Sequence, residues 1–190
     1  SLLLSTLLLA LIGFSQKNMN AIRIDDGLKF EINGVLDEPI WSSAIPTSGF
    51  TELEPNPNTS VDQDSEISIL YDNRGVYIGI ENYDTAPDSI LTELSKRDEF
   101  NNVDWIGVII DPYQAGLNGF GFFLTAAGVQ CDAKYTPDED FSWNAVWQSD
   151  VKITDKGWTA EYFIPFSSLR FPENDVEQEK KVRGTPYNPM

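Results

Sequence analysis

The residues of this chain best suited to contact a ligand are two tryptophans set four positions apart. Trp143 and Trp147 lie in a stretch rich in Asp, Ser and Asn, with Asn144 between them. On an extended segment, side chains four residues apart lie on the same side. Aromatic faces stack on the apolar faces of sugar rings, while neighbouring amides hydrogen-bond the hydroxyls. We therefore predict a carbohydrate-binding platform here; the alternative is that both rings pack against the domain, as large aromatic side chains usually do.

A second candidate cluster contains Arg97, Asp98 and Asp104. An arginine–carboxylate pair can orient sugar hydroxyls through charge-assisted hydrogen bonds. The same residues would serve equally well as a structural ion pair that holds a loop in place. The sequence leaves both interpretations open.

Two acidic runs supply candidate ligands for calcium, which takes six to eight oxygen ligands in proteins. The first run contains Asp62, Asp64 and Glu66, and the second contains Asp138 and Asp140. The first run lacks the glycine that an EF-hand loop needs at its sixth position, so that motif is excluded. Acidic clusters also arise by chance in a chain with 30 Asp and Glu. We therefore treat calcium as a candidate structural cofactor and these residues as its candidate ligands.

The composition favours a binding protein over an enzyme. The chain has 190 residues, 13 Lys and Arg against 30 Asp and Glu, and a net charge of −17, which repels nucleic acid and anionic lipid surfaces. It contains no His, so a Ser–His–Asp or Cys–His nucleophile cannot form. The single Cys131 can form neither an intrachain disulfide nor a thiolate zinc site. The remaining enzyme class is a small glycoside hydrolase, which needs two carboxylates about 5–9 Å apart, and Glu161 is one candidate.

The sequence pattern predicts that short β-strands position these candidate residues. Apolar and polar residues alternate in most of the segments between turn residues, and the strand at 105–110 is apolar on both faces. The predicted strands are 66–71, 76–83, 105–110, 120–125, 129–135, 146–153 and 158–164. The first two and the last two form hairpins over short turns, and no stretch of ten residues has helical periodicity. These patterns predict an all-β, single-domain antiparallel β-sandwich of the immunoglobulin or jelly-roll type, with Trp41, Trp105 and Trp158 in its core.

The two ends of the chain differ from this body. Residues 2–14 are uncharged and leucine-rich, which is typical of the apolar region of a secretory signal and too short to span a bilayer. A buried helix or a membrane anchor is the alternative. We interpret residues 1–16 as a truncated signal peptide, 17–172 as the sandwich, and 173–190 as a linker or truncated end without the alternation of a final strand.

Six segments follow one another in a distinctive order and spacing. They are INGVLDEPIW (32–41), LYDNRGVYIGI (70–80), DWIGVIID (104–111), GVQCD (128–132), SWNAVW (142–147) and GWTAEYFIPFSSLRF (157–171). Together they resemble the family 9 carbohydrate-binding modules, in the variant that opens large bacterial surface proteins with a C-terminal domain of unknown function. The resemblance covers approximately residues 24–172.

This resemblance implies a non-catalytic β-sandwich that binds sugars, often with structural calcium. Two departures stand out. Where sugar-gripping members of the family carry a Trp and a Glu, this chain has Asn101 and Gly107. A Trp-Gly strand that usually follows the last segment is replaced by residues 177–181 (EQEKK), four of which are charged.

We therefore expect an exported carbohydrate-binding module, located in the periplasm, at the outer membrane or cell surface, or secreted. Its expected partners are a polysaccharide and the C-terminal domain of a larger surface protein or glycoside hydrolase. One alternative is a structural module that has lost sugar binding and packs against a C-terminal outer-membrane barrel. The other is the small glycoside hydrolase.

Overall fold

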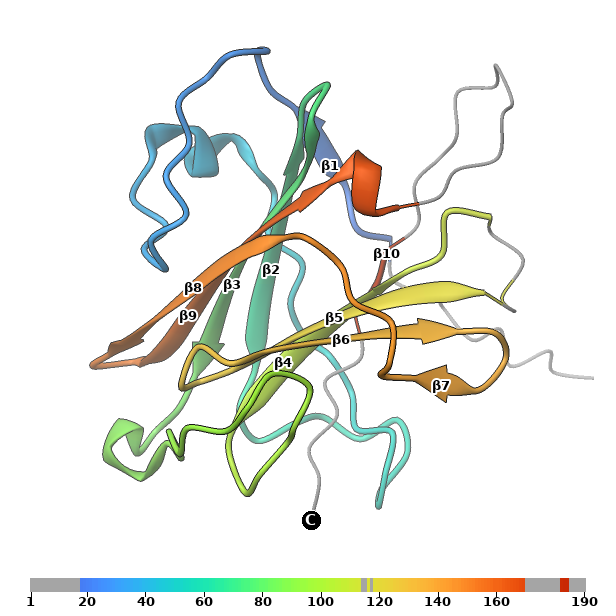
Figure 1. Ribbon diagram of the computed structural model, residues 1–190. Coiled ribbons are helices and arrows are strands. Elements are labelled where there is room, and N and C mark those ends of the chain that lie inside the picture. The colour runs from blue at the N-terminus through green and yellow to red at the C-terminus, as the bar shows by residue number, and fades with distance from the viewer. Residues whose placement is uncertain (1–17, 114–115, 117, 170–181, 185–190) are drawn as a thin grey trace, which may run out of the picture.

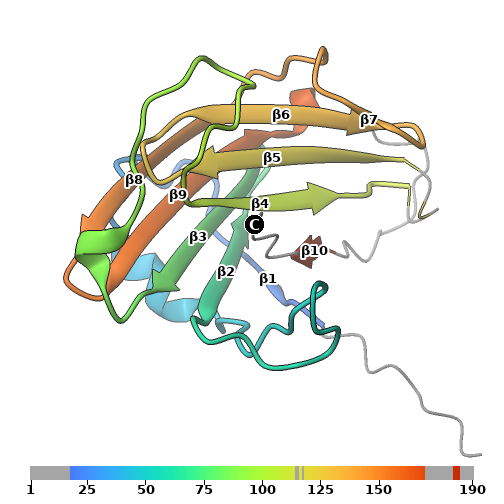
Figure 2. The same ribbon diagram turned by 90° about the horizontal axis from the view of Figure 1, so that it is seen from below.

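The protein is a sandwich of two five-stranded sheets, seen in a computed structural model that describes residues 18–113, 116, 118–169 and 182–184 (Figures 1 and 2). Sheet I has the order β1 (Ala21–Arg23), β2 (Ser65–Tyr71), β3 (Gly75–Tyr83), β9 (Gly157–Pro165) and β8 (Gln148–Thr154). Sheet II has the order β10 (Val182–Gly184), β4 (Trp105–Ile110), β5 (Gly119–Thr125), β6 (Gln130–Tyr135) and β7 (Glu139–Asp140). All neighbours are antiparallel except β1 and β2. The predicted all-β sandwich is therefore confirmed.

Helical structure in the described residues is limited to three short 3₁₀ segments. They are η1 (Pro39–Ser43), η2 (Pro87–Ser89) and η3 (Phe166–Ser168). Within the described ranges, no helix combines the length and the hydropathy needed to cross a membrane.

In the turn of the predicted β2–β3 hairpin, the Asp72 side chain accepts backbone hydrogen bonds. The Asp72 carboxylate accepts the N–H groups of Arg74 (2.8 Å) and Gly75 (3.2 Å), as short polar side chains do in tight turns. This turn fixes the register that places Ile69 opposite Ile78. Alternate residues of β2 and β3 consequently face sheet II.

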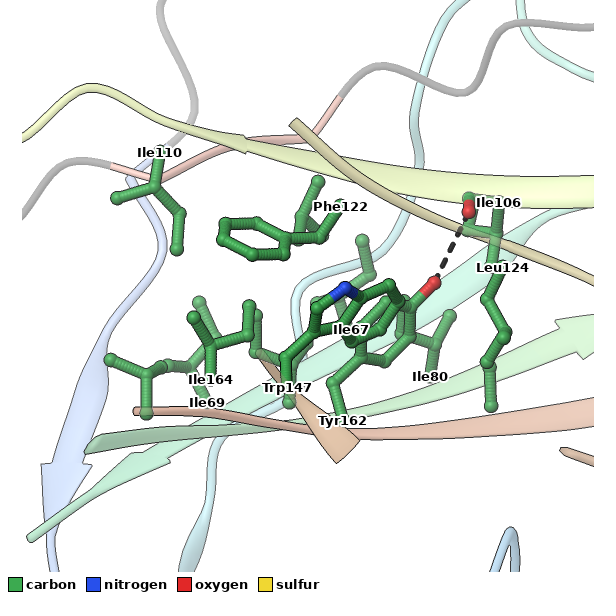
Figure 3. Packing of buried hydrophobic residues seen from close by; sticks show 14 of the residues in the cluster. Ile67, Ile69, Ile80, Ile106, Ile110, Phe122, Leu124, Trp147, Tyr162 and Ile164 are labelled. Atoms are coloured by element: carbon green, nitrogen blue, oxygen red, sulfur yellow. Dashed lines mark hydrogen bonds between the residues drawn. The ribbon is translucent and has the colours of Figure 1, made fainter. Parts of the chain in front are cut away.

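The main core lies between the sheets (Figure 3). Isoleucines of β2 and β3 and the rings of Phe122, Trp158 and Tyr162 fill it. The Tyr162 hydroxyl crosses from sheet I to sheet II and donates to the Ile106 carbonyl (3.1 Å). Trp158 lies in this core as predicted.

A second apolar layer covers the outer side of sheet I. Residues 24–44, which we call the covering segment, run along the side of sheet I that faces away from sheet II (Figure 2). Trp41 of this segment is buried, as predicted, together with Leu70 and Tyr77 of the sheet. The Tyr77 ring stacks on Phe163, and Phe30 of the covering segment packs on Tyr77.

Three features differ from the sequence predictions. β1, β7 and β10 have two or three residues each, too few for periodicity to reveal. β10 pairs with β4, so our expectation of no strand after residue 172 was wrong; pairing of three residues uses backbone groups and needs no alternation. Trp105 is half-buried rather than buried, because it lies on the outer side of sheet II.

Candidate functional site

The predicted aromatic platform folds against the core. Trp143 and Trp147 do lie on the same side of their segment, since both rings contact Phe122. That side faces inward. Trp143 is half-buried, whereas Trp147 is only 6% exposed. Asn144 is exposed, and its amide donates to the Ser142 carbonyl (3.2 Å).

The position of Trp147 matches the packing alternative and argues against the platform role. One face of its indole stacks on Tyr162, with centroids 5.3 Å apart, and the edge of Phe122 approaches it at 5.5 Å. A sugar ring needs an open aromatic face to stack on. Trp147 has none, so of the two rings only Trp143 keeps a partly open surface.

Arg97 and Asp98 meet at a buried carboxylate that the sequence analysis did not single out. Asp132 is fully buried and accepts hydrogen bonds from the Arg97 guanidinium, the Trp147 indole N–H (3.2 Å) and the Ala145 N–H (2.5 Å). Asp98 accepts the Asp132 N–H (3.0 Å). Every oxygen of Asp132 is engaged by the protein itself, so this cluster ties segment 141–147 to β6. The structural interpretation of the arginine–carboxylate pair fits this arrangement.

Asp104 lies apart from that cluster. Its carboxylate accepts the Leu91 N–H (2.7 Å), while its own N–H donates to the Leu91 carbonyl (3.2 Å). The Asp104 carbonyl accepts the Ala126 N–H (2.8 Å). Asp104 therefore anchors the loop that precedes β4 to the end of β5.

Carboxylates of both acidic runs accept hydrogen bonds from the protein itself. No group of three or more Asp, Glu, Cys or His is assembled to hold a metal ion within the described part of the chain. Asp64 uses both oxygens on the Gly49 N–H (3.0 and 2.8 Å), and Asp140 accepts the Ser142 N–H (2.9 Å) and hydroxyl (2.6 Å). The remaining predicted ligands also belong to no such group; they are Asp62, Glu66 and Asp138.

Glu161 does not stand in an open cleft. It is fully buried beneath the covering segment, where it accepts the N–H groups of Asn33 (2.9 Å) and Gly34 (3.1 Å). Burial and the nearby charge of Glu38 raise the pKa of Glu161 to about 7. A substrate cannot touch this carboxyl in the closed fold, which weakens the glycoside hydrolase alternative.

A groove lies beside this buried carboxyl, along the covering segment. It has a volume of about 760 Å³ and mixed charge, being lined by Lys29, Phe30, Glu31, Asp37, Glu38 and Arg74 among others. Phe30 packs on Tyr77 and Trp41 and so presents little free ring area. The groove therefore lacks the flat aromatic wall that a sugar site requires.

The outer side of sheet II carries the strongest concentration of aromatic side chains outside the core. The half-buried rings of Phe100, Trp105, Tyr135 and Phe141 surround the buried Phe123, and we call these five residues the aromatic face. Phe100 contacts Trp105, Phe123 and Phe141 with ring centroids 5.0 to 5.8 Å apart. The outward positions of β4, β5 and β6 hold no charged residue.

Small residues beneath the aromatic face determine how its rings lie. A Cβ on Gly107 would come within 2.2 Å of the Phe123 ring, and one on Gly121 within 2.6 Å. The Phe123 ring therefore rests directly on the strands, at the place where the resemblance aligns a sugar-contacting Glu with Gly107. Asn101, the other aligned position, is exposed beside Phe100. Periodicity alone could not find this face, because it does not say which side of β4 meets the other sheet.

Two similar solved structures are a family 9 carbohydrate-binding module from Caldicellulosiruptor kristjanssonii in complex with cellotriose and in complex with glucose. Each is 13% identical, with a TM-score of 0.55 over 83% of this chain and 72% or 73% of the other. This chain therefore has a family 9-like fold. No family model matches the sequence, and no curated protein matches it significantly.

Proposed function

We propose that this domain binds carbohydrate on the aromatic face of sheet II and catalyses no reaction. The observation that carries the proposal is the set of half-buried rings, Phe100, Trp105 and Phe141, grouped on the outer side of sheet II, where β4, β5 and β6 carry no charged residue. Sugar rings bind such surfaces through their C–H faces. The exposed amide of Asn101 lies next to Phe100 in the chain and would hydrogen-bond a hydroxyl. The family 9-like fold supports the same class of ligand.

The second candidate function is the structural module that has lost sugar binding. The observation that favours it is the contact of Phe123 with Gly107, because the ring occupies the space above a position where the family carries a sugar-contacting Glu. In this case the aromatic face would pack against another protein surface, such as the C-terminal domain of a larger parent protein.

Calorimetric titration of the full chain with cellotriose and glucose, preceded by a glycan array, tests the proposal. We expect Trp105→Ala and Phe141→Ala each to weaken sugar binding at least tenfold. Tyr113→Ala, which removes an exposed ring outside the aromatic face, is the matched control and should bind as the parent does. Loss of binding in Trp143→Ala alone would move the site to the platform predicted from the sequence. A blank array from folded protein would favour the structural module.

Calcium and export are separate proposals. A structural calcium ion would raise the melting temperature in calcium buffer relative to EDTA; equal melting temperatures would refute it. Export rests on the leucine-rich residues 2–14, which lie outside the described residues. Fusion of residues 1–16, placed behind a start codon and a basic leader, to a reporter active only in the periplasm would test export.

A further inference from the structure

Glu161 links the covering segment to the centre of sheet I. Its side chain is fully buried, and its Oε2 atom accepts two consecutive backbone N–H groups, from Asn33 and Gly34. The segment lies so close here that a Cβ on Gly34 would sit 2.6 Å from the Val151 carbonyl carbon. Gly34 has a φ of +77°, which glycine adopts without strain. This carboxyl therefore ties the covering segment to sheet I at Asn33 and Gly34.

Three buried polar atoms around this contact make no hydrogen bond within the described residues. They are Oε1 of Glu161, Oε2 of Glu38 and the indole Nε1 of Trp41. Trp41 lies above Gly79, the β3 residue that pairs with Glu161, and Glu38 directly precedes the short helix that contains Trp41. Buried polar atoms are almost always satisfied, and a charged carboxylate with a free oxygen is especially costly to bury. The closed arrangement therefore suits a neutral Glu161.

We propose that Glu161 is a protonation-dependent latch, which holds the covering segment on sheet I when neutral and releases it when ionised. The proton would reside on Oε1, because both backbone donors occupy Oε2. Ionisation would leave a buried charge facing Glu38. The covering segment is the layer between Glu161 and solvent. Displacement of this segment from sheet I would therefore let water hydrate the Glu161 carboxylate.

The groups that face Glu161 from neighbouring elements do not neutralise it. Glu38 approaches from the covering segment, Asp150 lies directly opposite on β8, and Glu81 lies one pair further on β3. Lys152 of β8 is one pair away on the same face, opposite Thr159. No ion pair reaches Glu161 in the described part of the chain. The surroundings are thus predominantly acidic.

The sign of the effect follows from the pKa of Glu161. Burial and the charge of Glu38 raise this pKa from 4.5 to about 7, against the opposing effect of the Asn33 and Gly34 N–H groups and of the Trp41 side chain. An exposed Glu161, with the latch open, would titrate near 4.5. The latch is therefore fully effective below pH 4.5 and loses its stabilising effect as pH rises towards 7. Each pH unit in this window changes the opening equilibrium up to tenfold, on the order of a hundredfold in total.

Hydrogen exchange of the Asn33 and Gly34 amides, measured by NMR on the full chain between pH 5 and 8, tests the latch. After correction for intrinsic exchange rates, we expect protection of both amides to fall by on the order of a hundredfold. Glu161→Gln, which is neutral at every pH, should keep constant protection. Asp150→Asn removes the exposed carboxylate opposite and should retain the pH dependence. Constant protection in the parent, or an unchanged dependence in Glu161→Gln, would overturn the proposal.

A second measurement covers the case in which Glu161→Gln fails to fold. Carbon-13 NMR of the parent protein, labelled at glutamate carboxyl carbons, follows the titration of Glu161 directly. A midpoint near 7 supports the latch, and a midpoint near 4.5 rules it out. Neither outcome depends on sugar binding, so this test stands apart from that of the proposed function.

Discussion

The indole of Trp147 stacks on the ring of Tyr162 with the two planes only 12° apart. The pair lies between the sheets, where Tyr162 donates to the Ile106 carbonyl and Trp147 donates to the Asp132 carboxylate. A loop residue, a strand of sheet I and two strands of sheet II thus meet at one place. Trp147 therefore holds the two sheets and segment 141–147 together.

Asp132 should be among the most sensitive polar residues of the chain. Asp132→Asn keeps the shape of the side chain but removes the charge that faces Arg97 and exchanges one acceptor for a donor. Loss of a charged, buried hydrogen-bond partner costs about 2–4 kcal/mol of unfolding free energy. Urea unfolding of Asp132→Asn, with the exposed Asp150→Asn as control, measures this. Equal stability of the two variants would contradict the role assigned to Asp132.

The contact between Gly107 and Phe123 can be measured by a double-mutant cycle. Gly107→Ala alone should cost about 1–3 kcal/mol, because its methyl group overlaps the Phe123 ring. In the background of Phe123→Ala the same change should cost much less, since the overlapping ring is gone. Additive free energies in chemical unfolding would show that the two residues do not touch.

The thiol of Cys131 should be unreactive in the folded protein. Burial raises the pKa of this thiol from 9.0 to about 12, and the side chain is fully covered. The thiolate is the reactive form, so both access and ionisation are suppressed. Ellman's reagent at pH 8 should detect no thiol in native protein and one per chain in denaturant. Rapid labelling of the native protein would mean that the aromatic face opens readily.

Tyr77 should contribute to loss of stability in alkali. Burial and the nearby Asp72 charge raise the pKa of its hydroxyl from 10.0 to about 12. Its stabilising effect is therefore complete below pH 10 and disappears as pH rises from 10 to 12. Guanidinium unfolding of the parent across this window should show falling stability, and Tyr77→Phe should show a shallower fall. Other buried tyrosines, including Tyr162, titrate late as well, so the dependence should decrease without vanishing.

Alternation identified the long strands well, because each buries one side against a neighbour. The predicted 105–110 strand coincides with β4, and the two hairpins formed with the expected partners. Alternation could not tell which side of a strand meets the other sheet. In β6, the polar Gln130 and Asp132 pair with inward-facing Leu124 and Phe122, while Cys131 lies on the outer side. Because of the same ambiguity, the sequence analysis predicted that Trp147 is exposed and did not detect the aromatic face.

The contact between Gly34 and Glu161 joins residues 127 positions apart in the chain. A polypeptide leaves the ribosome from its N-terminus, so Asn33 and Gly34 emerge long before β9, which carries Glu161. Trp41 and Ile24 pack mainly with Leu70 of β2 and Tyr77 of β3, whereas the Asn33 and Gly34 amides have no acceptor until Glu161 of β9 has been made. Contacts this distant also slow folding, since a long loop must close before they form. The covering segment can therefore be tied to Glu161 only after β9 has been made.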